Sequence, residues 1–153
     1  MASKIDELDR KILRRLQADA SPSVEQLAAS VKLSRNACWR RIKALEADGI
    51  IRRRVALLNA EALSLGLTAL VLIRTREHDE EWLSLFREIV RDTPDIVGAY
   101  RMSGDLDYLL RVQVGSVADY DRFYQRLIGR ISIADISASF VMEELKETTE
   151  LPV

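Results

Sequence analysis

Six side chains in residues 34–43 are of the types that recognise nucleic acid, and they recur at helical spacing. They are Ser34, Arg35, Asn36, Trp39, Arg40 and Lys43. Arginine can make two coplanar hydrogen bonds to the edge of guanine, and asparagine can do the same to adenine. The sequence therefore predicts that this group faces the major groove of double-stranded DNA. For Trp39 two roles stay open, packing on the following strand or contact with the DNA backbone.

The surrounding residues predict two short helices joined by a tight turn, the pattern of a helix-turn-helix. An apolar stripe at helical spacing marks the first helix, and another marks the inward side of the second. The stripes are Val24, Leu27, Ala28 and Val31, then Cys38, Ile42 and Leu45. Ser34 is placed to cap the second helix with its hydroxyl, and Gly49 is placed to end it.

Residues before and after this motif complete a small DNA-binding domain. Ile5, Leu8, Ile12 and Leu16 recur at helical spacing and predict its first helix. Residues 50–58 are typical of a strand and include three consecutive arginines, Arg52, Arg53 and Arg54. We expect a wing, or a strand that leaves the domain beside the DNA phosphates. A solubilising strand edge is the alternative role for the three arginines.

Charge divides the chain into two unlike parts. Residues 1–58 hold 13 Lys and Arg against 7 Asp and Glu, a net charge of +6, whereas residues 59–153 carry −7. DNA would repel the acidic second part, so we expect that part to have another task. The domains predicted are residues 1–50 for DNA binding, 51–65 for the wing strand and linker, and 66–153 for the rest.

The second part predicts an α+β domain with the strand and helix order βαββαβ, which is ferredoxin-like. Strands are expected over residues 68–74, 96–102, 108–114 and 136–142, with helices at 82–90 and 117–127. Both helices would then cover one face of an antiparallel sheet. The other face is too apolar to meet water, so we expect a second copy of the chain to cover it in a homodimer.

Several ordered motifs resemble the Lrp/AsnC, or feast/famine, family of transcriptional regulators over nearly the whole chain. They are LDRKILRRLQADA (8–20), LAASVKLS (27–34), RRIKALEADGII (40–51), MSGDLDYLLRV (102–112) and SFVMEELKETTELP (139–152). The resemblance implies an N-terminal winged helix-turn-helix and a C-terminal domain that senses small amino acids. It also implies dimers that assemble into tetramers, octamers or larger rings. CWRR (38–41), RRRVALL (52–58) and TTELP (148–152) look most like regulators of cysteine or sulfur metabolism, which makes cysteine or another small amino acid the expected effector.

The turn at residues 103–107 has the chemistry to hold an amino acid. A glycine lets the backbone expose N–H groups to a carboxylate, and two aspartates can accept hydrogen bonds from an ammonium group. The expected effector-binding residues are Tyr100, Met102, Ser103, Gly104, Asp105, Asp107 and Tyr108. In the family this pocket lies between dimers, which implies that Ser137 and Ser139 contribute from the last strand. The alternative is a plain hairpin that Asp107 caps.

One position departs from the family pattern, because Lys32 stands where glycine is common in the turn. If that position requires positive φ, the lysine costs about 1 kcal/mol.

Other features bound the function. The single cysteine, Cys38, permits no intramolecular disulfide and fits a reducing cytoplasm, and we expect it to be buried. No apolar run is long enough to span a membrane, and residues 1–10 do not resemble a signal peptide. The only histidine, His78, is expected to be solvated, and no catalytic residue, metal site or cofactor is predicted. We expect an effector-responsive transcriptional regulator; the alternatives are a DNA-architectural protein without a sensor and, least favoured, an enzyme.

Overall fold

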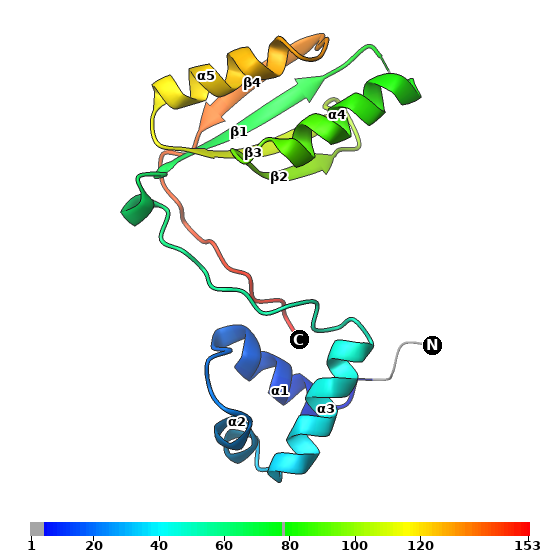
Figure 1. Cartoon of the computed structure of the whole chain (residues 1–153), viewed down its shortest axis with the longest axis vertical. Helices are drawn as coiled ribbons and strands as arrows, with labels where there is room; N and C mark the ends of the chain where they lie inside the picture. Colours follow the sequence, from blue (N-terminus) through cyan, green and yellow to red (C-terminus); the bar gives the residue numbers. More distant parts are fainter. Residues whose placement is uncertain (1–4, 78) are drawn as a thin grey trace. The chain divides into compact units, whose positions relative to one another are not determined.

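The computed structural model describes residues 5–77 and 79–153, which form two compact units (Figure 1). The first unit contains the chain up to Leu57 together with the tail Lys146–Val153, and the second is Leu58–Leu145. The tail thus groups with the first unit, whereas the sequence predicts it to be part of the second domain. Residues 58–65, assigned to the linker, group with the second. The expectation for His78 lies outside the described residues.

Three capped helices build the first unit: α1 (Glu7–Ala18), α2 (Val24–Ser30) and α3 (Arg35–Ala47). A short polar side chain caps the start of each helix by accepting a hydrogen bond from a backbone N–H of the first turn. The capping residues are Asp6 for α1, Ser23 for α2 and Ser34 for α3. Helix α3 ends at Ala47, and Gly49 follows the C-cap residue Asp48 as the predicted stop signal. The φ of +72° at Gly49 suits glycine and lets Ile50 N–H donate to the carbonyl of Leu45 at 2.9 Å.

Apolar residues from all three helices form the core of this unit, Ile12, Leu13, Leu27, Ala28, Val31, Cys38, Ile42 and Leu45. The prediction that Cys38 is buried is confirmed, since none of its surface is exposed. Burial raises the pKa of the Cys38 thiol, which keeps it protonated and poorly nucleophilic. This cysteine therefore acts as a packing residue.

The turn between α2 and α3 places a lysine in the left-handed region. Lys32 has a φ of +57°, so this position does require positive φ. The turn is closed by Leu33 N–H, which donates to the carbonyl of Ala28 at 2.9 Å. A lysine here is strained relative to glycine by about 1 kcal/mol.

Residues 52–58 are extended and exposed, but they are not part of a sheet. The prediction of a strand in this segment is therefore wrong for the single chain. The physical reason is that a strand needs a neighbour for its main-chain hydrogen bonds, and the described residues of one chain provide none. Val55, Leu57 and Leu58 remain 60–74% exposed.

The tail is anchored on α1 by hydrogen bonds between its main chain and side chains of the helix. Leu151 N–H donates to Oε1 of Gln17 at 2.7 Å, and Nε2 of Gln17 donates to the carbonyl of Leu151 at 3.1 Å. Nε of Arg14 donates to the main-chain oxygen of Val153 at 2.6 Å. The Val153 side chain packs against the core of the three helices. These contacts join residues from opposite ends of the sequence into one unit.

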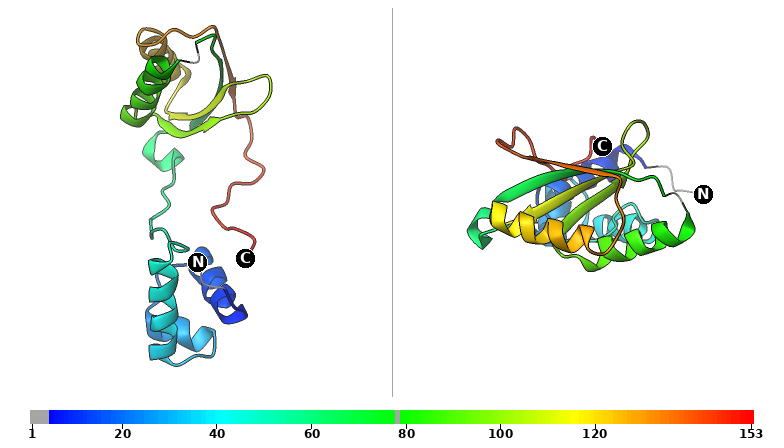
Figure 2. Two further views of the ribbon diagram at one scale, coloured as in Figure 1. Left: turned by 90° about the vertical axis from the view of Figure 1, so that its right-hand side faces the viewer. Right: turned by 90° about the horizontal axis from the view of Figure 1, so that it is seen from above.

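The second unit has the predicted βαββαβ order. After a 3-10 turn, η1 (Glu61–Leu63), come β1 (Leu67–Arg74), α4 (Glu80–Asp92), β2 (Ile96–Arg101), β3 (Tyr108–Val114), α5 (Val117–Ile128) and β4 (Asp135–Phe140). The strands pair antiparallel in the order β2-β3-β1-β4. Figure 2 shows α4 and α5 along the same face of the sheet.

Along each central strand of this sheet, successive side chains point alternately to one face and to the other. Every second residue of β1 and β3 is buried against α4 and α5, among them Val71 and Leu110. The intervening residues point to the other face, where Leu72 lies opposite Leu109 and Leu70 opposite Arg111. None of the described helices of this unit covers that second face. Its apolar centre therefore has no cover within the unit.

Candidate nucleic-acid interface and binding loop

The expected DNA-reading residues lie on the outward side of α3. Ser34 uses its hydroxyl to accept N–H of Ala37 at 3.2 Å, which fixes the start of the helix. Asn36 and Arg40 are exposed one helical turn apart, and Trp39 is 50% exposed. The buried stripe of α3 is on the inward side. The helix thus presents an amide and a guanidinium together, both of which suit base edges.

Ion pairs sort the cations of this surface into two groups. Arg35 is paired with Glu25, Lys43 with Glu46 at 2.7 Å, and Arg54 with Glu46 at 3.4 Å. The hydrogen bond from Lys43 is the main cause that lowers the pKa of Glu46. In residues 5–77 and 79–153, no ion pair holds Arg40, Arg52 or Arg53. An exposed ion pair contributes only about 0–1 kcal/mol, so both the paired and the unpaired cations can bind DNA. The unpaired cations do so without breaking an ion pair.

Arg41 has a different task from its neighbour Arg40. Its guanidinium donates to Asp9 at 2.7 Å and to Asp6 at 2.8 Å, and these bonds raise the pKa of Arg41. The backbone N–H of Asp9 and this guanidinium hold the pKa of Asp6 below its ordinary value. The cluster ties α3 to the capped start of α1. Arg41 is therefore a structural cation of the three-helix unit.

The turn between β2 and β3 is anchored at both ends and open at its tip. Gly104 has a φ of +114°, which only glycine adopts readily, and nothing lies within 4 Å of where a Cβ would be. Met102 N–H donates to the carbonyl of Asp107 at 2.8 Å, which closes the hairpin. Ser103 and Asp105 are exposed. The tip is thus accessible to a small molecule.

The two aspartates of this turn have different surroundings. Oδ2 of Asp107 accepts the backbone N–H of Thr75 at 2.8 Å, so this carboxylate fastens the turn to the end of β1. The carboxylate of Asp105 is exposed, while its main-chain carbonyl accepts Nε of Arg74 at 2.8 Å. Asp105 is therefore the carboxylate better placed to meet an ammonium group. No local sequence pattern predicts a role for Arg74, because only the tertiary arrangement brings this arginine to the turn.

The structure brings some of the other expected effector residues together and separates the rest. Tyr100 and Met102 are 54% and 41% exposed and flank the turn. Tyr108 instead lies on the helix-covered face, with its ring centroid 4.6 Å from that of Phe86. It shares no surface with Tyr100, because their positions are on opposite faces of the sheet. Its alternation with three buried residues, Leu110, Val112 and Val114, was the sequence signal for this core position.

Ser137 and Ser139 are exposed on β4, on the same face as Tyr100. The order β2-β3-β1-β4 puts them at the opposite edge of the sheet from Tyr100. Three strand spacings of about 4.8 Å make that separation about 14 Å. One small ligand within one chain therefore does not span both edges.

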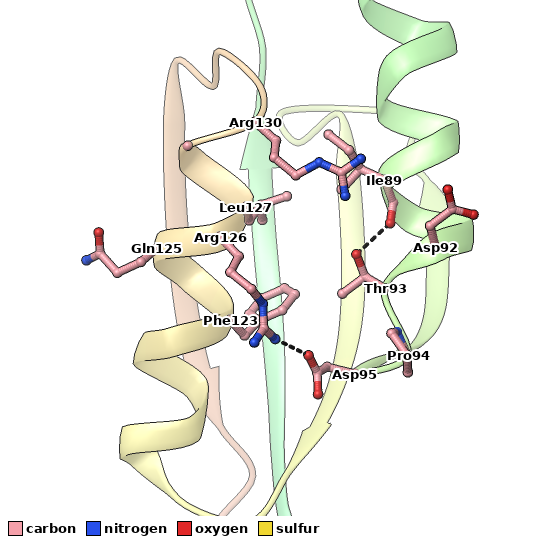
Figure 3. Close-up of a pocket in the computed structure, with 11 residues that line it drawn as sticks. Ile89, Asp92, Thr93, Pro94, Asp95, Phe123, Gln125, Arg126, Leu127 and Arg130 are labelled. Carbon is pink, nitrogen blue, oxygen red and sulfur yellow. Dashed lines mark hydrogen bonds and ion pairs between the residues drawn. The ribbon is translucent and has the colours of Figure 1, made fainter.

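A groove of about 620 Å³ lies between α4 and α5 (Figure 3). Its floor includes the deeply buried Ile89, Phe123 and Leu127. Arg126 reaches across it from α5 to Asp95, and the hydroxyl of Thr93 donates to the carbonyl of Ile89 at 2.6 Å. None of the expected effector residues lines this groove. Arg126 and Asp95, two of its charged groups, already pair with each other, so the turn at 103–107 remains the better candidate.

The described residues also bear on two other kinds of site. No group of three or more His, Cys, Asp or Glu is placed to hold a metal ion in that part of the chain. Likewise, none of its helices is both long and apolar enough to cross a bilayer.

Comparison with known proteins gives consistent matches for both units. Residues 5–52 match the model of a winged helix-turn-helix DNA-binding domain, and residues 68–151 match that of the Lrp/AsnC ligand-binding domain. The glutamate uptake regulatory protein of Zymomonas mobilis is 48% identical over 153 residues, covering 100% of this chain and 93% of that protein. The DNA-binding transcriptional activator DecR of Escherichia coli is 46% identical over 150 residues, covering 97% and 99% respectively.

Solved structures agree with this. An AsnC family transcriptional regulator from Agrobacterium tumefaciens superposes with a TM-score of 0.93 at 54% identity, covering 96% of each chain. A transcriptional regulator from Neisseria meningitidis, solved in complex with L-Met, also gives 0.93 at 33% identity and covers 97% of each chain.

Proposed function

The chain belongs to the Lrp/AsnC family of DNA-binding transcriptional regulators, and we propose that it senses its amino acid at the turn of residues 103–107. The observation that carries this proposal is the exposed tip of that turn. Gly104 there adopts a φ of +114°, and the exposed carboxylate of Asp105 follows directly. Backbone N–H groups would meet the effector's carboxylate, and Asp105 would meet its ammonium group.

The side chain of the effector would rest against Tyr100 and Met102, which are exposed beside the turn. Neither is charged, so the surface favours a small or sulfur-containing side chain. The L-Met complex of the Neisseria relative supports an effector of this kind, whereas another relative is named for glutamate uptake. We propose cysteine as the first amino acid to test, on the motif resemblance in residues 38–41, 52–58 and 148–152.

On DNA, we propose that Asn36 and Arg40 read bases while Arg52, Arg53 and Arg54 hold phosphates. Asn36 and Arg40 are exposed on one side of a capped helix, and Arg40 has no ion pair in the described parts of the chain. Arg52–54 belong to an exposed, extended segment with high positive charge, which suits contact with a phosphate backbone. Ser34, Arg35, Trp39 and Lys43 would contact the backbone at the edges of this surface.

A screen of the twenty amino acids by thermal unfolding tests the sensing proposal. A ligand that binds the folded chain stabilises it by RT ln(1 + [L]/Kd), about 2.7 kcal/mol at a hundredfold excess over Kd. We expect one or a few small amino acids to raise the unfolding temperature of the second unit. The same amino acids should change the assembly size or the affinity for operator DNA. If no amino acid shifts either quantity, the chain acts as a DNA-architectural protein instead.

The uncovered sheet face leads us to propose that the second unit is the dimerisation unit. Leu70, Leu72 and Leu109 form its apolar centre, and a second copy would cover them. Ser137 and Ser139 of one copy would then approach an effector held by another. Further assembly to tetramers, octamers or larger rings is expected from the family.

A fragment of residues 58–145 tests this without the DNA-binding unit. It should sediment as a dimer or larger at micromolar concentration, because the apolar face remains on it. Leu72→Lys should shift the fragment toward monomer by burying a charge in the interface, whereas Leu85→Lys on the exposed side of α4 is the matched control. A well-folded wild-type monomer would contradict the proposal.

A further inference from the structure

A strongly basic groove lies between α1 and the end of α2, separate from the residues assigned to DNA above. It has a volume of about 490 Å³ and no carboxylate in its lining. The residues that line it are Lys11, Arg14, Arg15, Ala18, Ser30, Val31 and Lys32. Four cations in one groove without an acid favour an anionic ligand.

Three of these cations are available for such a ligand. Arg14 is bound by Glu7 at 3.2 Å and by the main-chain oxygen of Val153. Lys11, Arg15 and Lys32 are exposed, and no ion pair involves them within residues 5–77 and 79–153. Lys11 and Arg15 are four residues apart on α1, so both project on the same side of the helix.

The backbone at Lys32 is a second, independent observation. Its φ of +57° would be unstrained for glycine, yet the chain has a lysine at this position, and that lysine is among the residues that line the groove. A strained residue at a candidate site is a reason to look for a role of its side chain.

We propose that this groove is a second phosphate-binding site, which holds the sugar-phosphate backbone of the duplex that α3 enters. Lys32 precedes Ser34, the cap of α3, by two residues, so the groove adjoins the start of the recognition helix. From there Arg15 and Lys11 extend the positive surface along α1. A duplex strand that leaves the major-groove contact would follow these cations. The inference rests on the DNA-binding function and adds a contact that no base sequence specifies.

The variant Lys32→Gly distinguishes a loss of phosphate binding by the groove from a loss of folding stability. It removes the cation and relieves the backbone strain, so the unfolding temperature of the DNA-binding unit should stay equal or rise. Binding of a random-sequence duplex by the full chain is followed by fluorescence anisotropy between 50 and 200 mM salt. Loss of one phosphate contact should reduce the salt slope by up to about 0.9 and weaken binding about five-fold at physiological salt.

A double variant and a matched control complete the test. Lys11→Gln with Arg15→Gln should reduce the slope by up to about 1.8. Arg10→Gln removes an equal charge from α1 outside the groove and should leave the slope near wild type. If Lys32→Gly and the double variant retain the wild-type slope, or if Arg10→Gln loses as much as Lys32→Gly, the groove is not a phosphate site. A wild-type chain that bound no duplex would overturn the DNA-binding assignment as well.

Discussion

Replacing Arg40 by alanine should remove most of the chain's preference for its operator over random DNA. Arg40 is exposed on α3, and in the described residues no carboxylate forms an ion pair with its guanidinium. A bidentate contact to guanine is worth about 1–3 kcal/mol of discrimination, which corresponds to roughly 5- to 150-fold. Operator sites selected from a random library, and then titrated against wild type and variant, measure this directly.

Arg53→Ala is the matched control for that prediction. It also removes one exposed, unpaired guanidinium of the DNA-binding unit, but from the extended segment that we assign to phosphates. We expect it to weaken operator and random DNA alike and to reduce the salt slope by about one unit at most. If Arg40→Ala weakened both DNAs equally, Arg40 would be a phosphate contact and the base-reading assignment would be wrong.

Replacing Gly104 by valine should abolish binding of the amino acid. The φ of +114° is strained for any residue with a Cβ, and most of all for a β-branched one, so the turn must change its backbone to accept valine. The N–H groups that would meet the carboxylate then lose their directions. Since open space surrounds the site of the new Cβ, the rest of the unit should remain folded. Calorimetry with the amino acid found in the thermal screen measures the loss.

Asp105→Asn tests the ammonium contact in the same turn. A charge-assisted hydrogen bond contributes about 1.5–3 kcal/mol, so affinity should fall roughly 10- to 150-fold. Asp121→Asn, an exposed carboxylate on α5, is the control and should bind normally. Asp107→Ala is a less specific test, because it also removes the bond to Thr75 N–H that anchors the turn. Unchanged affinity in both Gly104→Val and Asp105→Asn would place the pocket elsewhere.

Local patterns in the sequence were sufficient for most of the fold. Ser34 as a cap, Gly49 as a stop and the buried stripe of α3 are all signals within one helix, and all three are confirmed. Alternation in residues 108–114 predicted β3 with its correct bounds. These signals suffice because capping and burial act over a few residues.

The remaining features depend on neighbours that are distant in sequence. The bond from Thr75 N–H to Asp107 follows from the pairing of β1 with β3, which no local pattern specifies. Residues 50–58 have the composition of a strand, but composition does not supply a pairing partner. The anchoring of Leu151 on Gln17 likewise had no local signal, since a single exposed glutamine is unremarkable in a helix.

This anchored tail makes the second unit an insertion within the first. Residues up to Leu57 and the tail Lys146–Val153 belong together, and all of Leu58–Leu145 lies between them in the sequence. Seen from the first unit, the insertion is a long loop that connects Leu57 to the tail. While the insertion is folded, its structure limits the distance between the two ends of this loop. When it unfolds, the loop becomes flexible and the tail's effective concentration at α1 falls, with a closure cost that grows by about 0.6 kcal/mol per doubling of loop length. The stabilities of the two units are therefore linked through chain connectivity. During synthesis, the contacts between the three helices and the tail can form only after the whole second unit has been synthesised.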